Sequence, residues 1–180
     1  TPVISCFEQL SALSKATFTA SLEIHVKFNT GMNRLGFELS EASEVLKRIQ
    51  EIKALKVVGV CTHLLNGEDS VAKEGFTSQQ IRKFSELKPL FSKMPVTYHA
   101  LNSAGLIGYH FHKDLLEEQG WRWPLGSRIG LALYGVHPEI TPRVELHEVM
   151  SVKTRIAALR KVKAKEVISY GGTFSPKRDS

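Results

Sequence analysis

The 180-residue sequence lacks several features that mark specialised classes of protein. It has no apolar run of about 18 residues, so no segment is long enough to span a membrane. Residues 1–5 show no basic cluster ahead of an apolar stretch, so we expect no signal peptide in these residues. They also lack an initiator methionine, and we expect the chain to begin within a longer protein. With 42% hydrophobic and 23% charged residues, the composition is globular, not disordered or coiled-coil.

Cysteine is also scarce. Cys6 and Cys61 are far apart, each in an apolar run, and neither belongs to a C-x-x-C pair. Zinc and redox motifs are therefore excluded, and we predict no metal site. We expect two buried, reduced thiols in a cytoplasmic protein.

Charge is unevenly distributed within a net value of +6. Residues 1–142 hold 15 basic and 14 acidic side chains, whereas residues 143–180 hold nine and four. The excess lies around residues 160–165, where no aromatic side chains interleave with the lysines. This pattern favours a solvated strand edge or turn over a nucleic-acid surface. We expect neither nucleic acid nor membrane as a partner.

Short apolar runs rich in β-formers alternate with helical patterns. We expect helices from Ser40, where acidic residues fill the first turn, and over about residues 71–91. Strands buried on both faces and alternating with helices are typical of a parallel sheet. The predicted fold is therefore α/β, an incomplete TIM-type (β/α)8 barrel, because a complete barrel needs about 250 residues. Its strands are expected at residues 3–6, 22–28, 57–62, 96–100 and 130–133.

The pattern changes near residue 138. Pro138 and Pro142 indicate a linker, and residues 149–158 and 167–174 resemble strands with no helix between them. We therefore divide the chain into residues 1–137, a portion of the barrel, and residues 138–180. The second part is expected to be the linker and first strands of an antiparallel β domain.

The longest polar motif, residues 25–37, begins on an expected strand. Lys27 and Arg34 lie seven residues apart across the Thr30–Gly31 turn at the end of that strand. Active sites of β/α barrels lie at this edge of the sheet, so both side chains can face one cleft. A solvated pair is the simpler interpretation. However, a bare ammonium inside an apolar strand is costly, which favours a functional role for Lys27.

Further motifs follow later strands, and each has a structural explanation when taken alone. His63 can be a hydrogen-bonded core histidine, and Ser103 can cap a helix. Equally, Asn102 and Ser103 with Gly130 and Leu131 can offer hydroxyl and backbone N–H groups to one phosphate. These motifs occupy residues 61–63, 99–105, 127–135 and 168–174.

Taken together, the order and spacing of these motifs resemble the alanine racemase family, enzymes of fold type III that use pyridoxal 5'-phosphate. The resemblance runs from about residue 4 to residue 174. It implies a bacterial, cytoplasmic homodimer with shared active sites that interconverts L-alanine and D-alanine for peptidoglycan. Racemisation then needs one base on each face of the α-carbon.

The resemblance also implies cofactor-binding positions. Arg34 matches the arginine that binds the phenolic oxygen of the cofactor and contacts the substrate. Ser103, Gly130 and Leu131 match positions that bind the cofactor phosphate, with Asn102 beside them.

Further roles follow from the same resemblance. Arg128 matches the arginine that faces the pyridine nitrogen and keeps it unprotonated, which favours racemisation over transamination and decarboxylation. His63 matches a residue that orients the arginine and the tyrosine. Lys27 matches a lysine that carries a carbamate in many members and holds Arg34. Tyr170 matches an acid/base that serves the partner subunit's site.

Two departures from the family pattern bear on activity. No lysine here matches the one that forms the Schiff base, so we expect the chain by itself to be inactive. The turn before Tyr170 often has glycine but here reads as residues 163–166, with Lys165 in it. If that turn needs a left-handed backbone conformation, lysine at position 165 destabilises it relative to glycine.

Three alternatives remain open. The first is a racemase of broader amino-acid specificity. The second is a non-catalytic pyridoxal-phosphate carrier of the same barrel type, which would lack the second domain that bears Tyr170. The third is an inactive product that only docks onto a longer partner.

Overall fold

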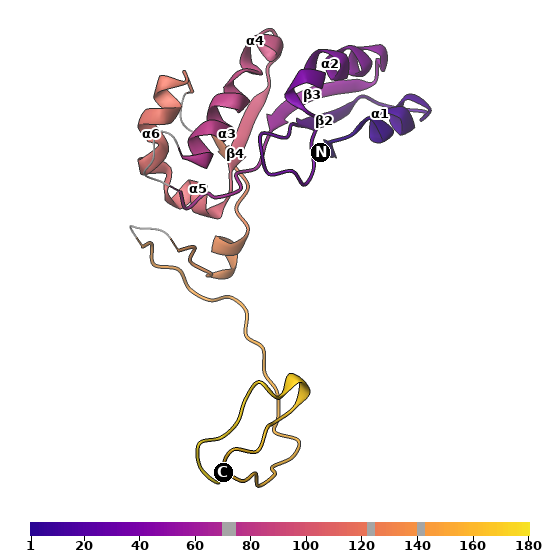
Figure 1. Ribbon diagram of the computed structural model, residues 1–180. Coiled ribbons are helices and arrows are strands. Elements are labelled where there is room, and N and C mark those ends of the chain that lie inside the picture. The colour runs from indigo at the N-terminus through magenta and orange to yellow at the C-terminus, as the bar shows by residue number, and fades with distance from the viewer. Residues whose placement is uncertain (70–74, 122–124, 140–142) are drawn as a thin grey trace. The chain divides into compact units, whose positions relative to one another are not determined.

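The computed structural model describes residues 1–69, 75–121, 125–139 and 143–180 (Figure 1). This chain divides into two compact units, residues 1–149 and residues 150–180. The division falls later than the domain boundary predicted at residue 138, which stays a prediction. Within the described ranges, no helix combines the length and apolar character needed to cross a membrane.

One parallel sheet organises the first unit. Its strands pair in chain order, each with the strand before it. A helical segment follows each of the first four strands, so the chain repeats a β/α unit. The predicted α/β class and partial TIM-type barrel are therefore confirmed. The strands are β1 (Val3–Ile4), β2 (Leu22–Lys27), β3 (Leu55–Cys61), β4 (Thr97–Leu101) and β5 (Gly126–Ser127).

The helices follow from local sequence signals. A reciprocal capping box between Glu38 and Glu41, rather than a cap at Ser40, starts the segment that leads into α2. The helix predicted over 71–91 is two helices, α3 and α4, and its residues 71–74 lie outside the described ranges. The helical segments are α1 (Phe7–Ser14), η1 (Leu39–Glu41), α2 (Ala42–Glu51), α3 (Phe76–Ser85), α4 (Lys88–Phe91), α5 (Ser103–Ile107), α6 (Tyr109–Glu118), η2 (Leu131–Tyr134) and η3 (Tyr170–Gly172), where η denotes a 3₁₀ helix.

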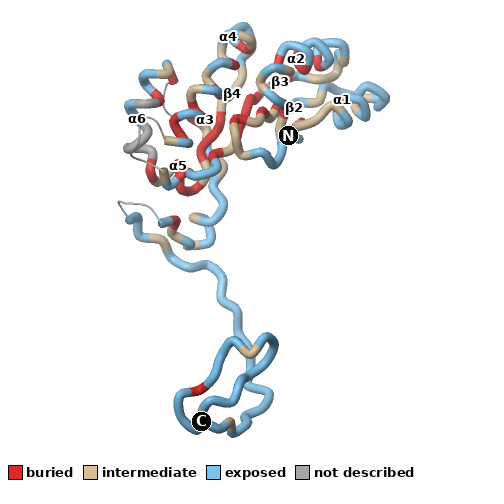
Figure 2. The backbone as a smooth tube through the Cα atoms, viewed as in Figure 1, coloured by how far each residue is buried: buried red, intermediate tan, exposed pale blue. Residues whose placement is uncertain are grey.

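The apolar core lies between the sheet and its helices, where most buried residues gather (Figure 2). On β2, Ile24 and Val26 are fully buried in this core, as is Phe28 just after the strand. Successive strand residues point to opposite faces, so His25 and Lys27 project from the other face of the sheet. The sheet thus has one apolar face under the helices and one face that carries polar groups.

The fifth strand differs from the prediction. Residues 130–133 do not form a strand, and β5 lies earlier, at Gly126 and Ser127. Gly126 suits close pairing with β4, because a Cβ there would lie 2.8 Å from the Cβ of His99. Leu131 and Leu133, whose apolar character suggested burial, are exposed on η2.

The second unit contains no extended strand, although strands were expected at 149–158 and 167–174. It holds one antiparallel bridge between Ile168 and Phe174, the short turn η3, and a pair of backbone hydrogen bonds between Val162 and Ser180. Almost every residue there is exposed (Figure 2). A strand is stable only beside a hydrogen-bonding neighbour, and among the described residues 150–158 make no backbone hydrogen bond. Lys165 adopts the left-handed conformation, with φ of +69°.

Candidate active site

Polar side chains gather where neighbouring strands end. Lys27 is the last residue of β2, and His63 lies two residues beyond β3. Ser103 begins α5 after β4, and Arg128 follows β5 directly. Because the strands are parallel, these four residues share the carboxyl edge of the sheet, the edge that carries active sites in β/α barrels.

Arg128 is the hub of this edge. One guanidinium nitrogen, Nη1, donates to His99 Nδ1 and to the His99 carbonyl oxygen, the latter at 3.3 Å. The other, Nη2, donates to the Thr62 carbonyl oxygen and, at 2.9 Å, to His63 Nδ1. A guanidinium only donates, so both imidazoles accept through Nδ1 and carry their proton on Nε2. Arg128 therefore ties the ends of β3 and β4 together and holds both histidines neutral.

A third histidine extends this network. His25 Nδ1 lies 2.7 Å from His99 Nε2, with the ring centroids 4.8 Å apart. Since Nε2 of His99 carries the proton, His99 donates and His25 accepts. The hydrogen bonds thus run from Arg128, just after β5, through His99 on β4 to His25 on β2.

The electrostatics agree with neutral rings. Burial, reinforced by the Arg128 charge, lowers the pKa of His63 to about 4 and that of His99 to about 4. Burial also lowers the pKa of His25, and the N-terminal amine and Arg128 act in the same direction. At neutral pH, Arg128 is consequently the fixed cation within a set of uncharged rings.

Lys27 is the second cation at this edge. Burial lowers the pKa of its amine, and the charges of Arg128 and Arg34 lower it further, whereas Cys61 acts in the opposite direction. Arg34 is exposed on the turn beyond β2, and its charge also lowers the pKa of His63. The charges of Arg34 and Arg128 thus lower the pKa of both Lys27 and His63, and the placing of all four residues in one cleft stays a prediction.

A cavity of about 210 Å³ opens beside Arg128. The Ser103 hydroxyl oxygen accepts the backbone N–H groups of Gly130, at 3.0 Å, and Ala132, at 3.2 Å. A Cβ on Gly130 would meet nothing within 4 Å, so the space above this loop is open. The lining comprises His63, Glu68, Asn102, Ser103, Ala104, Arg128, Gly130, Leu131 and Pro138.

Asn102 has a structural contact on each side of its amide. Its Oδ1 accepts the Gly105 N–H at 2.9 Å, which caps α5, and its Nδ2 donates to the Leu64 carbonyl oxygen at 3.2 Å. The side chain therefore fixes the loop after β3 to the start of α5 while it lines the cavity.

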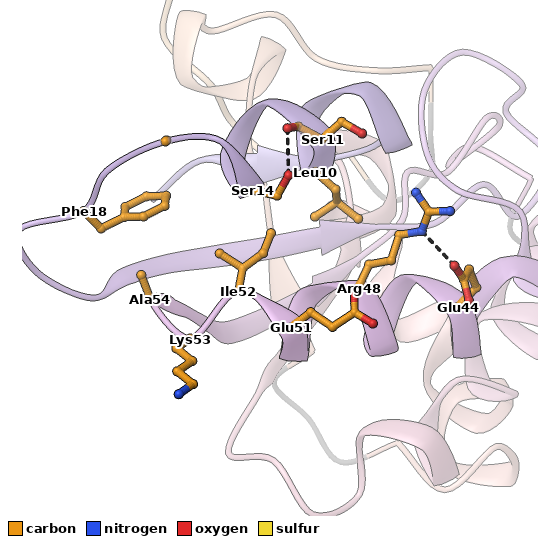
Figure 3. A pocket seen from close by; sticks show the side chains of 11 residues that line it. Leu10, Ser11, Ser14, Phe18, Glu44, Arg48, Glu51, Ile52, Lys53 and Ala54 are labelled. Atoms are coloured by element: carbon orange, nitrogen blue, oxygen red, sulfur yellow. Dashed lines mark hydrogen bonds and ion pairs between the residues drawn. The ribbon is translucent and has the colours of Figure 1, made fainter.

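A larger cavity of about 530 Å³ lies elsewhere, between α1 and α2 (Figure 3). It includes Phe18 and Ala54, which precede β2 and β3, and so belongs to the amino edge of the sheet. Its Arg48 and Glu44 form an exposed ion pair at 2.7 Å. The described residues of its lining include no histidine or cysteine, so this part of the molecule does not repeat the chemistry found around Arg128.

Most residues predicted for the site share this edge. Tyr170 belongs to the second unit, where its side chain is fully exposed on η3, and its place at the site stays a prediction. Cys61 is buried as expected, but Cys6 is only partly buried. The predicted residues at the carboxyl edge are Lys27, Arg34, His63, Asn102, Ser103, Arg128, Gly130 and Leu131.

Sequence reasoning missed the parts played by His25 and His99. The sequence did contain a signal for His25. It stands two residues before Lys27 on one strand, so the two side chains share a face of the sheet. Across the described residues, no group of three or more histidine, cysteine or acidic side chains could hold a metal ion.

A sequence model described as the N-terminal domain of alanine racemase matches residues 1–138. The chain belongs to the alanine racemase family. The alanine racemase of Thermodesulfovibrio yellowstonii is 34% identical to it, over 99% of this chain and 45% of that relative. The alanine racemase of Helicobacter pylori is 32% identical, over 96% of this chain and 46% of that relative. The chain thus spans about half the length of the curated relatives it matches.

Solved alanine racemase structures share the fold. The Bacillus anthracis alanine racemase with bound L-Ala-P superposes with a TM-score of 0.68 at 25% identity, covering 98% of this chain and 45% of that one. The biosynthetic alanine racemase of Pseudomonas aeruginosa gives 0.67 at 23% identity, covering 98% and 46%. The expected family and barrel are both confirmed.

Proposed function

We propose that this chain supplies part of the active site of an alanine racemase that binds pyridoxal 5'-phosphate and interconverts L-alanine and D-alanine. The observation that carries the proposal is the Arg128 guanidinium, held between two neutral histidines beside a cavity lined by a hydroxyl and backbone N–H groups. When bound, the cofactor serves as an electron sink for the charge left at the α-carbon.

The donor set of the cavity fits a phosphorylated cofactor. The Ser103 hydroxyl accepts the N–H groups of Gly130 and Ala132 and keeps its own hydrogen to donate, and a neutral donor of this kind can bind phosphate. Open space above Gly130 leaves room for the group. Among the described residues of the lining, Glu68 alone carries a carboxylate, and it is exposed to solvent. We assign phosphate binding to Ser103, Gly130 and Leu131, with Asn102 positioning them.

Arg128 would face the pyridine nitrogen of the cofactor. Burial lowers the pKa of this guanidinium, but arginine keeps its proton in proteins and has no acceptor atom. A ring nitrogen facing it therefore stays unprotonated, which limits how strongly the ring withdraws electrons. His63 and His99 keep the guanidinium in place.

Lys27 and Arg34 would act on the side of the site beyond β2. A lowered amine pKa increases the fraction of Lys27 that is neutral and able to add to carbon dioxide. The resulting carbamic acid loses a proton, and the carbamate so formed is an anion suited to hold Arg34. Arg34 would then bind the phenolic oxygen of the cofactor and the substrate.

Tyr170 is proposed as one of the two bases, acting in the active site of the partner subunit of a cytoplasmic homodimer. Its exposed phenol, on a turn between two left-handed residues, is open to such a contact. The D-alanine formed would serve peptidoglycan synthesis. Because none of the lysines here matches the Schiff-base position, the 180-residue chain alone is proposed to be inactive.

The deciding experiment uses the longest open reading frame that contains this sequence, loaded with pyridoxal phosphate. We expect exchange of the α-hydrogen of both alanine enantiomers in deuterated water, and at least about a tenfold loss of rate in Arg128→Gln. Cofactor binding without exchange would support the carrier alternative. Faster exchange of larger amino acids than of alanine would support the broader racemase.

The 180-residue chain gives a complementary test. Borohydride treatment in the presence of pyridoxal phosphate, followed by peptide mapping, is expected to show no stoichiometric adduct at one specific lysine. Such an adduct would overturn the proposed inactivity.

A further inference from the structure

One fully buried polar side chain beside the site has no part in the function proposed above. Gln80 lies on α3 with no exposed surface, next to the buried core residue Ile81. An amide buried in this way is costly unless its donors and acceptor are all engaged. Where its hydrogen bonds go therefore indicates what the residue does.

The hydrogen bonds of Gln80 go to the loops that follow β2 and β3. Its Nε2 donates to Thr30 Oγ1 at 3.1 Å and to the His63 carbonyl oxygen at 3.0 Å. Its Oε1 accepts the Leu65 N–H at 2.8 Å. Thr30 and Thr62, both buried, join the two loops by a 2.7 Å hydrogen bond between their hydroxyls. Glutamate lacks the donors for this arrangement, and methionine lacks every polar atom.

Hydrogen bonds within the first loop connect this anchoring to the turn that leads to Arg34. Asn29 Oδ1 accepts the N–H groups of Gly31, at 3.1 Å, and Asn33, at 3.0 Å, which closes the turn. Gly31 has a φ of +135°, and a Cβ there would lie 3.0 Å from the ring of Phe76, the first residue of α3. Helix α3 therefore contacts this turn twice, at Thr30 and at Gly31.

The second loop is fixed to the same helix at further points. Thr77 Oγ1 donates to the Asn66 carbonyl oxygen at 2.5 Å, and the Phe76 N–H donates to Asp69 at 2.9 Å. His63 lies at the start of this loop, with its imidazole on Arg128 and its carbonyl oxygen on Gln80.

We infer that Gln80 is a positioning residue of the racemase site, whose buried amide fixes the turn leading to Arg34 and the loop bearing His63 relative to each other. The residue touches neither substrate nor cofactor, and it acts through the two loops. The inference rests on the proposed function for the meaning of Arg34 and His63. Its test measures the two loops directly, so a failure to bind pyridoxal phosphate leaves that test intact.

The test compares Gln80→Met with Ile81→Val in the full 180-residue chain by NMR. Both changes affect α3, but only the first removes hydrogen bonds to the loops. In Gln80→Met we expect the imidazole of His63 to become more solvated, so that its pKa rises by about one unit or more from the wild-type value of about 4. We also expect exchange of the Leu65 amide hydrogen to accelerate by about tenfold or more. In Ile81→Val both quantities should match the wild type, whatever the change in melting temperature.

A milder pair of variants decides the matter if Gln80→Met does not fold. Thr30→Val keeps the shape of the side chain but removes the hydroxyl that Gln80 and Thr62 share, whereas Thr30→Ser keeps the hydroxyl. The first is expected to raise the pKa of His63 and the second to leave it near the wild-type value. An unchanged His63 titration and an unchanged Leu65 exchange rate in folded Gln80→Met, or an unchanged His63 titration in Thr30→Val, would overturn the inference.

Discussion

The imidazole of His25 reaches that of His99 across an intervening strand because Gly59 has no side chain between them. His25 lies on β2 and pairs in register with Gly59 on β3, while His99 lies on β4. A Cβ on Gly59 would lie 2.7 Å from His25 Nδ1, the atom that lies 2.7 Å from His99 Nε2. Glycine at this position is therefore what allows the hydrogen bond to form.

Gly59→Ala is accordingly expected to lower the free energy of unfolding by about 1–3 kcal/mol through overpacking. It should also break the contact between His25 and His99. Urea unfolding measures the first effect and imidazole NMR the second. The matched control is the double variant His25→Ala/Gly59→Ala, in which the ring that clashes is gone. The two changes should couple by about 1 kcal/mol or more, and strict additivity would contradict the steric explanation.

The neutral histidines make stability depend on pH. In the unfolded chain a histidine has a pKa near 6.5, whereas burial and Arg128 hold the pKa of His63 and of His99 at about 4 in the fold. As pH falls through this window, the unfolded state binds protons first, so stability decreases. The free energy of unfolding should drop by on the order of 3 kcal/mol from pH 6.5 to pH 4, after allowing for the partial exposure of His63.

Urea unfolding at several pH values between 7 and 4 measures this dependence. His99→Gln keeps an amide in place of the ring but removes one titrating group, so its stability should vary less steeply with pH. An equal slope in this variant would show that His99 is not one of the groups responsible.

Ser103→Ala removes the acceptor of two backbone N–H groups, those of Gly130 and Ala132. We expect a loss of stability of about 1 kcal/mol, because the loop is partly exposed and water can replace the hydroxyl. Affinity for pyridoxal phosphate should fall by about tenfold or more, whereas affinity for pyridoxal, which has no phosphate, should not change. Fluorescence titration with both compounds separates the two outcomes.

The control for this change is Ser92→Ala, whose hydroxyl donates to the Pro89 carbonyl oxygen at an exposed position. It should leave both affinities unchanged. Parallel losses for pyridoxal and pyridoxal phosphate in Ser103→Ala would argue against a phosphate-binding role.

Tyr170→Phe, in the intact parent protein, is expected to spare cofactor binding and to reduce racemisation by orders of magnitude. Two bases on opposite faces each remove the α-hydrogen of one enantiomer, so solvent deuterium exchange should be lost for one enantiomer far more than for the other. Mixing with a variant that lacks the Schiff-base lysine should restore some activity, because a heterodimer keeps one intact site. Equal losses for both enantiomers without rescue would exclude a base that acts across the interface.

The main strands could be predicted from the sequence because apolar runs rich in β-forming residues mark them. The motifs of the candidate site follow these runs along the chain. Strands β2, β3 and β4 lie close to their predicted positions. The roles of the residues around Arg128 came from the resemblance to the alanine racemase family, and the ends of strands indicated only the edge of the sheet on which motifs should lie.

Other parts were not accessible, for physical reasons that differ from place to place. β5 consists of a glycine and a serine, which carry no apolar signal, whereas the apolar Leu131 and Leu133 that suggested a strand are exposed. From the sequence alone, Gln80 is predicted to be an ordinary exposed residue of a helix. Its burial and its three partners depend on loops at residues 30 and 62–65, far from it in the chain, and no local pattern encodes such contacts.

The pairing of strands in chain order has a consequence for how the site forms in time. Each strand docks onto the one just before it, so the sheet can grow from β1 toward β5 as the chain leaves the ribosome. The bond between His25 and His99 cannot form until β4 is in place, and Arg128 arrives only with β5. Histidines placed early therefore lack their Arg128 partner until β5 has docked onto β4.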